Sequence, residues 1–124
     1  MKSITLMSIL VLVLASLVFV TNAQAVEVMA VTMSGTVIDN ACASSHSSDL
    51  AEFIKTHTKE CTLMPPCVLS GYAIYSDGKL YKFDKASNAK VEKFLRGEAS
   101  KLQVTIVAKK TGEELELVSI ENQK

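Results

Sequence analysis

The first 25 residues limit what the rest of this chain can fold into. Residues 1–3 (Met-Lys-Ser) make a short basic start, residues 4–20 are an apolar run, and Ala23 and Ala25 are small residues where a signal peptidase cuts. We therefore expect residues 1–25 to be a secretory signal peptide. Cleavage near Ala25 would leave an exported protein, periplasmic or secreted. The alternative is an uncleaved anchor, in which this segment alone would contact a membrane.

Removal of this segment leaves residues 26–124 of a chain of 124, enough for one domain with one core. Lys2 is the only charged residue before Glu27, so the remainder carries twelve basic and thirteen acidic side chains. This balance excludes a nucleic-acid binder that works by bulk phosphate attraction, and it excludes an acidic disordered tail. The length excludes a multidomain enzyme.

Alternating apolar residues predict five strands, over residues 26–39, 68–76, 79–84, 102–109 and 114–121. Asp77-Gly78 predicts a tight hairpin turn between the second and third strands, because glycine adopts positive φ without steric cost. Gly35 inside the first strand predicts a bulge or a sharp bend. In the last strand the apolar residues change face after Leu117, which predicts a bulge or burial on both sides.

Residues 86–96 have apolar residues at helical spacing, and Gly97 is a suitable C-terminal stop. The order strand, insertion, strand, strand, helix, strand, strand is that of a small OB-like five-stranded barrel. We therefore expect one mainly β domain over residues 26–124, with one or two short helices. Residues 40–67 would form a Cys/His-rich helical insertion between the first two strands. The alternative is an open α+β sheet with the helix on one face.

The insertion contains every cysteine and histidine of the chain, namely Cys42, His46, His57, Cys61 and Cys67. Asp49 and Glu52 are placed to cap a helix that we expect over about residues 50–59. On that helix His57 and, if the last turn persists, Cys61 would project from the same apolar side, about one turn apart. Pro65 and Pro66 would then end the helix.

Three interpretations of the cluster stay open. Two of Cys42, Cys61 and Cys67 form a disulfide, with the third free or joining two chains as a dimer and the histidines as ordinary core or loop residues. Alternatively, the five residues hold zinc or copper, which take thiolate and imidazole ligands. A mixed site with one disulfide and a Cys–His copper centre is a variant of this. Finally, the odd cysteine is a redox-active thiol, although the chain has no C-x-x-C motif.

The aromatic residues of the expected hairpin offer a weaker hypothesis. OB-like proteins stack bases or sugars on aromatic side chains of this face, which makes Tyr72 and Tyr81 candidates for ligand stacking. Alternation of Tyr81 with charged residues is, however, typical of an ordinary core position. The chain has no H-E-x-x-H, no glycine-rich phosphate loop and no G-x-S-x-G, so we expect no catalytic residues.

Four groups of residues resemble an uncharacterised family of small exported bacterial proteins, in which an OB-like body carries a Cys/His-containing insertion after the first strand. These groups are Gly35-Thr36-Val37-Ile38-Asp39, Cys42 with His46, His57-Thr58-Lys59-Glu60-Cys61, and Cys67 before a Tyr-bearing strand. The resemblance covers most of residues 33–121 and implies the fold and export, but no activity. We therefore expect a non-enzymatic exported binding or structural module. The alternatives are a thiol-redox or metal-handling protein and, more weakly, a sugar- or oligonucleotide-binding barrel.

Overall fold

The computed structural model describes residues 28–124, so the predicted signal peptide and its cleavage site lie outside the described part. Within residues 28–124 no helix has both the length and the apolar character needed to cross a membrane. The elements of this part are β1 (Met29–Asp39), α2 (Asn40–Ser45), α3 (Leu50–Phe53), α4 (Lys59–Thr62), α5 (Pro65–Ser70), β2 (Tyr72–Ser76), β3 (Lys79–Phe83), α6 (Lys85–Leu95), β4 (Gln103–Thr111) and β5 (Glu114–Asn122).

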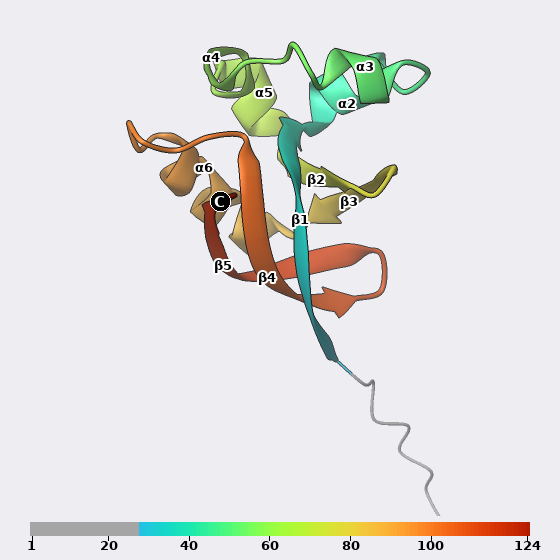
Figure 1. Ribbon diagram of the computed structural model, residues 1–124, viewed down its shortest axis with the longest axis vertical. Coiled ribbons are helices and arrows are strands. Elements are labelled where there is room, and N and C mark those ends of the chain that lie inside the picture. The colour runs from blue at the N-terminus through green and yellow to red at the C-terminus, as the bar shows by residue number, and fades with distance from the viewer. Residues whose placement is uncertain (1–27) are drawn as a thin grey trace, which may run out of the picture.

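The five strands form one sheet that closes in a ring, in the order β1-β2-β3-β5-β4 (Figure 1). The ring closes through β1, which pairs antiparallel with β4 from Met29 to Thr36 and with β2 from Thr36 to Asp39. A short parallel pairing joins β3 to β5. The prediction of a five-stranded, mainly β fold is confirmed, and the open-sheet alternative is wrong. The expectation of one or two short helices is also wrong, because residues 28–124 contain five helices.

Gly35 lies where β1 passes from one partner strand to the other. A Cβ at this position would overlap the carbonyl oxygen of Tyr75 in β2. The register of β1 runs through Gly35 without a shift. Of the bulge or sharp bend expected there, the bulge is therefore wrong. A glycine is needed because the β2 backbone approaches too closely for a side chain.

The bulge expected in the last strand is confirmed. Val107 of β4 lies opposite Ser119, whereas the next residue, Ala108, lies opposite Leu117. Val118 is therefore the extra residue, and its side chain is exposed to solvent. The shift places Ile120 on the same face as the buried Leu115 and Leu117, so Ile120 packs against the core.

Residues 65–71 differ from the sequence-based expectation. Pro65 and Pro66 begin a helix rather than only ending one, since proline fits the first turn, where no N–H donor is required. This helix, α5, includes residues 68–70, which were expected to be strand. Gly71 ends it with a φ of 79°, a conformation that favours glycine, and β2 begins at Tyr72.

The single helix expected over about residues 50–59 is also wrong, because α3 ends at Phe53 and α4 begins at Lys59. Two threonines favour the break by satisfying nearby backbone groups. The hydroxyl of Thr56 donates to the carbonyl of Phe53 at 3.1 Å. The hydroxyl of Thr58 accepts from the N–H of Cys61 at 3.2 Å, so Thr58 caps a new helix.

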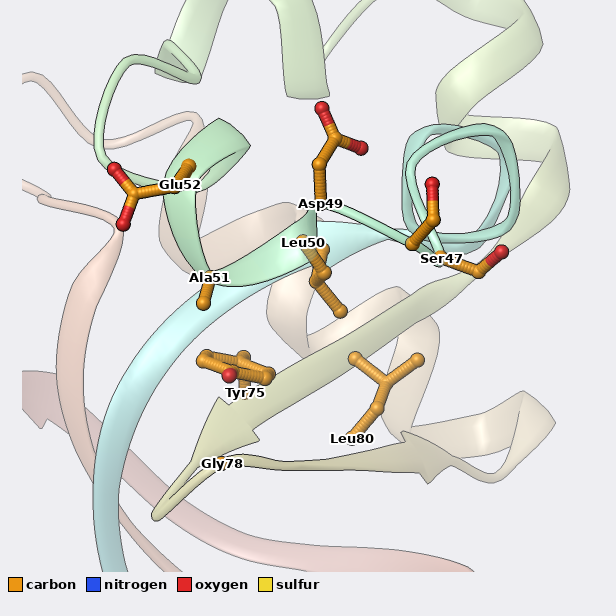
Figure 2. Close-up of a pocket in the computed structure, with 9 residues that line it drawn as sticks. Ser47, Asp49, Leu50, Ala51, Glu52, Tyr75, Gly78 and Leu80 are labelled. Atoms are coloured by element: carbon orange, nitrogen blue, oxygen red, sulfur yellow. The ribbon is translucent and has the colours of Figure 1, made fainter.

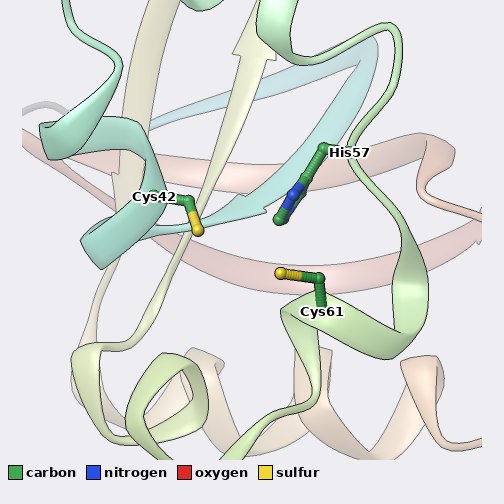
Figure 3. A group of neighbouring side chains, drawn as sticks. All are labelled: Cys42, His57 and Cys61. Carbon is green, nitrogen blue, oxygen red and sulfur yellow. The ribbon is translucent and has the colours of Figure 1, made fainter.

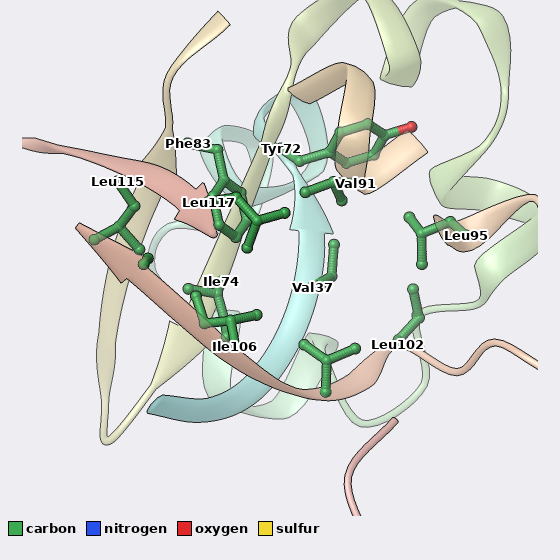
Figure 4. Close-up of a cluster of buried hydrophobic side chains, with 12 residues drawn as sticks. Val37, Tyr72, Ile74, Phe83, Val91, Leu95, Leu102, Ile106, Leu115 and Leu117 are labelled. Atoms are coloured by element: carbon green, nitrogen blue, oxygen red, sulfur yellow. The ribbon is translucent and has the colours of Figure 1, made fainter. Parts of the chain in front are cut away.

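The interior of the ring holds the main hydrophobic core, to which all five strands and α6 contribute (Figure 4). Because neighbouring residues of a strand point to opposite faces, Val37 lies in this core while Ile38 lies outside it. Ile38 and Ala73 form a second, smaller cluster with Ala43 of α2 and with Ile54. This second cluster supports the helical segment between β1 and β2, whose four short helices gather at one end of the ring (Figure 1).

Candidate metal centre

The centre begins at Asp39, the last residue of β1, which is fully buried. One carboxylate oxygen, Oδ1, accepts the N–H of Cys42 at 2.9 Å and thereby caps α2. The other oxygen, Oδ2, lies 3.1 Å from Nε2 of His57. A single carboxylate at the end of a core strand therefore positions both a cysteine and a histidine.

His57 lies in the stretch between α3 and α4, and its side chain is only 2% exposed. Besides Asp39, its Nε2 contacts Oγ1 of Thr62 at 2.8 Å. That hydroxyl donates to the carbonyl of Thr58, so it accepts from the ring. The hydrogen-bond network thus assigns the hydrogen to Nε2, which leaves the lone pair of the neutral ring on Nδ1. A metal-binding histidine commonly donates its other N–H to a carboxylate in this way.

The donor atoms of Cys42, His57 and Cys61 all lie within 4.8 Å of one another. Figure 3 shows the two thiols and the imidazole ring pointing into one space from three different segments. In a second group, the donor atoms of Asp39, Cys42 and Cys67 also lie within 4.8 Å of one another. Cys42 therefore belongs to both groups. Thiolates bound to one zinc ion at about 2.3 Å lie roughly 4 Å apart, so a small contraction would allow shared coordination.

The three cysteines are free thiols. Burial, and after it the Asp39 carboxylate, raises the pKa of Cys42 to about 12. The same two causes, in the same order, raise the pKa of Cys67. Reactive cysteines have lowered pKa values, so these two thiols are held in the unreactive form. A bound metal ion reverses this effect, because it deprotonates a coordinating thiol outright.

His46 lies outside both groups of donors. Its ring stacks on Phe53, with 3.6 Å between ring centroids and 6° between planes, and its Nδ1 lies 3.2 Å from Asp49. Asp49 consequently makes no side-chain cap to α3, contrary to the capping role expected for it. Four of the five predicted residues are therefore brought together, namely Cys42, His57, Cys61 and Cys67.

Asp39 is the residue of the centre that the sequence analysis missed. The sequence places Asp39 at the end of the first predicted strand and in the Gly35–Asp39 group, without a role at the Cys/His cluster. A usable signal was nevertheless present, because an aspartate that ends a strand three residues before a cysteine is placed to cap a helix and to hold that cysteine in its first turn.

A separate pocket of about 410 Å³ lies between the α3 region and the β2–β3 hairpin (Figure 2). Its lining includes the largely apolar side chains of Leu50, Tyr75 and Leu80. It also includes the carboxylates of Asp49 and Glu52. His46 already pairs with Asp49, and Lys55 pairs with Glu52 at 2.7 Å. Both charged groups of the lining are therefore engaged within the described part of the chain.

The two tyrosines considered for ligand stacking form no common platform. Tyr72 is only 1% exposed and belongs to the main core, where its hydroxyl donates to the carbonyl of Thr62 at 3.3 Å. The expectation that Tyr72 stacks on a ligand is corrected, because neither face of its ring is free. Tyr81 is half-buried, and the amine of Lys110 lies 5.7 Å from its ring centroid.

No protein-family model, curated protein or solved structure matches this chain. The resemblance to small exported OB-like proteins therefore stays a prediction. The clustered donors around Asp39 are the feature from which a function can be inferred.

Proposed function

We propose that this chain is an exported metal-binding module with an OB-like fold, in which zinc or copper is held by Cys42, His57 and Cys61. The strand order supports the OB-like assignment, since β1 pairs with both β2 and β4 and a helix lies between β3 and β4. The basic start, the apolar run and the small residues of the N-terminus support export.

One observation carries the metal assignment, namely two thiols and an imidazole within 4.8 Å of one another beside a buried carboxylate. Thiolate and imidazole are the ligands that zinc and copper prefer. Buried charges in proteins are paired or coordinate metals, and the one ion-pair partner of Asp39 within residues 28–124 is His57. Cys67 is the candidate fourth ligand, since its sulfur lies within 4.8 Å of Cys42.

A disulfide is the second candidate, and the shared position of Cys42 favours it. Cys42 lies close to Cys61 in one group and to Cys67 in the other, so oxidation with either partner is open to it. The proposed three-ligand site and a disulfide that uses Cys42 exclude each other, because the disulfide removes a ligand of both groups. A Cys42–Cys67 disulfide would leave His57 and Cys61, the two residues of the mixed copper site. A redox-active thiol has less support, since the pKa values of Cys42 and Cys67 are raised.

Cobalt titration of the metal-free, reduced protein tests the proposal. We expect one Co²⁺ per chain, with the near-ultraviolet absorption of thiolate–cobalt bonds, and displacement of cobalt by zinc. His57→Ala and Cys61→Ser should each lower the affinity at least about tenfold, because each removes a donor.

His46→Ala is the matched control, since it removes the other histidine of the same segment and should leave the affinity unchanged. Failure of the wild-type protein to bind any ion would refute the proposal. Equal loss of affinity in His46→Ala and His57→Ala would also contradict it.

Export is tested by mass spectrometry of the protein recovered from cells that express the full chain. We expect a mass that begins at Val26, as cleavage after Ala25 requires. The same mass reports the disulfide alternative, because each disulfide lowers it by two hydrogens. An intact Met1 in the exported fraction would contradict cleavage.

A further inference from the structure

We infer that Asp39 makes the proposed metal site selective for a divalent ion, zinc, over Cu⁺. The inference rests on the proposed function and names the ion of the same site. It follows from the charge that the fold buries beside the donors. Zinc and Cu⁺ both accept thiolate and imidazole ligands, so the donor atoms alone do not choose between them.

Within residues 28–124, no lysine or arginine balances the negative charge of Asp39. Asp39 is fully buried, and among the described residues the one basic group at ion-pair distance is the imidazole of His57. A histidine that binds a metal ion is neutral, so it does not balance this charge. The lysine of the nearby helix α4, Lys59, is turned elsewhere. Its amine donates to the carbonyls of Gly97 and Ser100, each at 3.0 Å. The bound ion therefore has to supply the missing positive charge.

Zn²⁺ and Cu⁺ leave different net charges in the buried site. With the thiolates of Cys42 and Cys61, Zn²⁺ forms a neutral unit, and the Asp39 carboxylate leaves one negative charge in the buried site. Cu⁺ has one positive charge fewer, so the same set of groups keeps two negative charges. Burying an additional unpaired charge is costly, so the carboxylate favours the divalent ion.

Asp39 is not one of the three proposed ligands, and it acts on the ion through two of them. Its Oδ2 accepts from Nε2 of His57, and its Oδ1 accepts from the N–H of Cys42. Two of the three proposed ligand residues, His57 and Cys42, are therefore in direct contact with the same carboxylate. This contact transmits the charge of Asp39 to the ion at short range, in a buried environment where screening by water is weak.

Asp39→Asn tests the inference, because asparagine also caps helices and removes the charge. It also loses one of the two hydrogen bonds that the carboxylate accepts, so the ratio of the two affinities, rather than either affinity alone, reports the effect of charge. Zinc affinity is measured by competition with a chromophoric chelator, and Cu⁺ affinity by competition with bicinchoninate under anaerobic, reducing conditions. We expect zinc affinity to fall about 10- to 100-fold, as changes in such outer residues typically produce, and Cu⁺ affinity to change less than about threefold.

Two control variants separate charge from structure. Asp84→Asn alters an equivalent cap, since Asp84 accepts from Ser87 at the start of α6, and it should leave both affinities unchanged. Thr62→Val removes the other contact of His57 Nε2 without changing charge, so it should not alter the ratio of the two affinities. Should Asp39→Asn be unfolded by circular dichroism, Asp39→Ser provides a second neutral cap.

The outcomes distinguish this inference from the proposal on which it rests. Binding of neither ion to the wild-type protein overturns the metal site itself. Equal losses for zinc and Cu⁺ in Asp39→Asn leave the metal site in place and overturn the role of Asp39 in selectivity. An unchanged zinc affinity in Asp39→Asn would likewise overturn the role of Asp39 in selectivity.

Discussion

Cys42 belongs to both groups of donors, and the reactivity of its thiol reports on its buried environment. Burial and the Asp39 carboxylate raise its pKa from 9.0 to about 12. At pH 8 this lowers the thiolate fraction roughly a thousandfold relative to an ordinary cysteine. We expect Cys42 of the native, metal-free protein to react with iodoacetamide slower than the unfolded chain by a similar factor, as followed by peptide mass mapping.

The control for this measurement is the protein in urea, where all three cysteines should be alkylated at comparable rates. Asp39→Asn should speed the native reaction of Cys42, because it removes the second largest cause of the raised pKa. Rapid alkylation of native Cys42 or Cys67 would instead favour the redox-active thiol.

At the scale of single elements, the break between α3 and α4 decides where His57 lies. Thr58 starts α4 by accepting the N–H of Cys61. We expect Thr58→Ala to destabilise the metal-free protein by about 1 kcal/mol, the usual effect of losing such a cap, measured by urea unfolding. It should also weaken cobalt binding, because Cys61 lies in the first turn of this helix.

Asp49→Ala is the matched control, since Asp49 precedes a helix of the same length but makes no side-chain cap to it. Its effect on stability should stay below about 0.5 kcal/mol, as for ordinary surface changes. Equal effects of the two substitutions would argue against Thr58 as the residue that separates the helices.

For the whole molecule, closure of the ring depends on the passage of β1 from β4 to β2 at Gly35. We expect Gly35→Ala to destabilise the protein by more than about 2 kcal/mol, because the new Cβ overlaps a backbone carbonyl that cannot move without disturbing β2. Gly112→Ala is the control. Gly112 has a φ of 61° but open space around it, so about 1 kcal/mol of backbone strain is expected there.

Metal binding should stabilise the whole domain, since the ligands come from segments that meet only in the folded chain. A zinc concentration one hundred times the dissociation constant should raise the free energy of unfolding by about 2.7 kcal/mol, as simple linkage requires. The measurement is urea unfolding with and without zinc under reducing conditions. His57→Ala should abolish the increase, and an increase that survives in this variant would place the ion elsewhere.

The number of strands, the hairpin at Asp77-Gly78 and the helix before Gly97 were predictable from the sequence, because each depends on periodicity or turn chemistry within about ten residues. The bulge at Val118 was predictable for the same reason. The helix expected over residues 50–59 failed because hydrogen bonds made by Thr56 and Thr58 outweighed an apolar periodicity that suited a longer helix.

The sequence alone determined where the candidate ligands gather, since every cysteine and histidine lies within residues 42–67. It could not determine which of them meet. That choice required the segment between β1 and β2 to pack back on these strands, as Ile54 does on Ile38 and Ala73. Asp39 at the end of β1 then meets a histidine eighteen residues later in the chain. His46, only four residues from Cys42, stacks on Phe53 instead, whereas His57 reaches the centre. Contacts between distant segments depend on tertiary packing, which local sequence patterns do not encode.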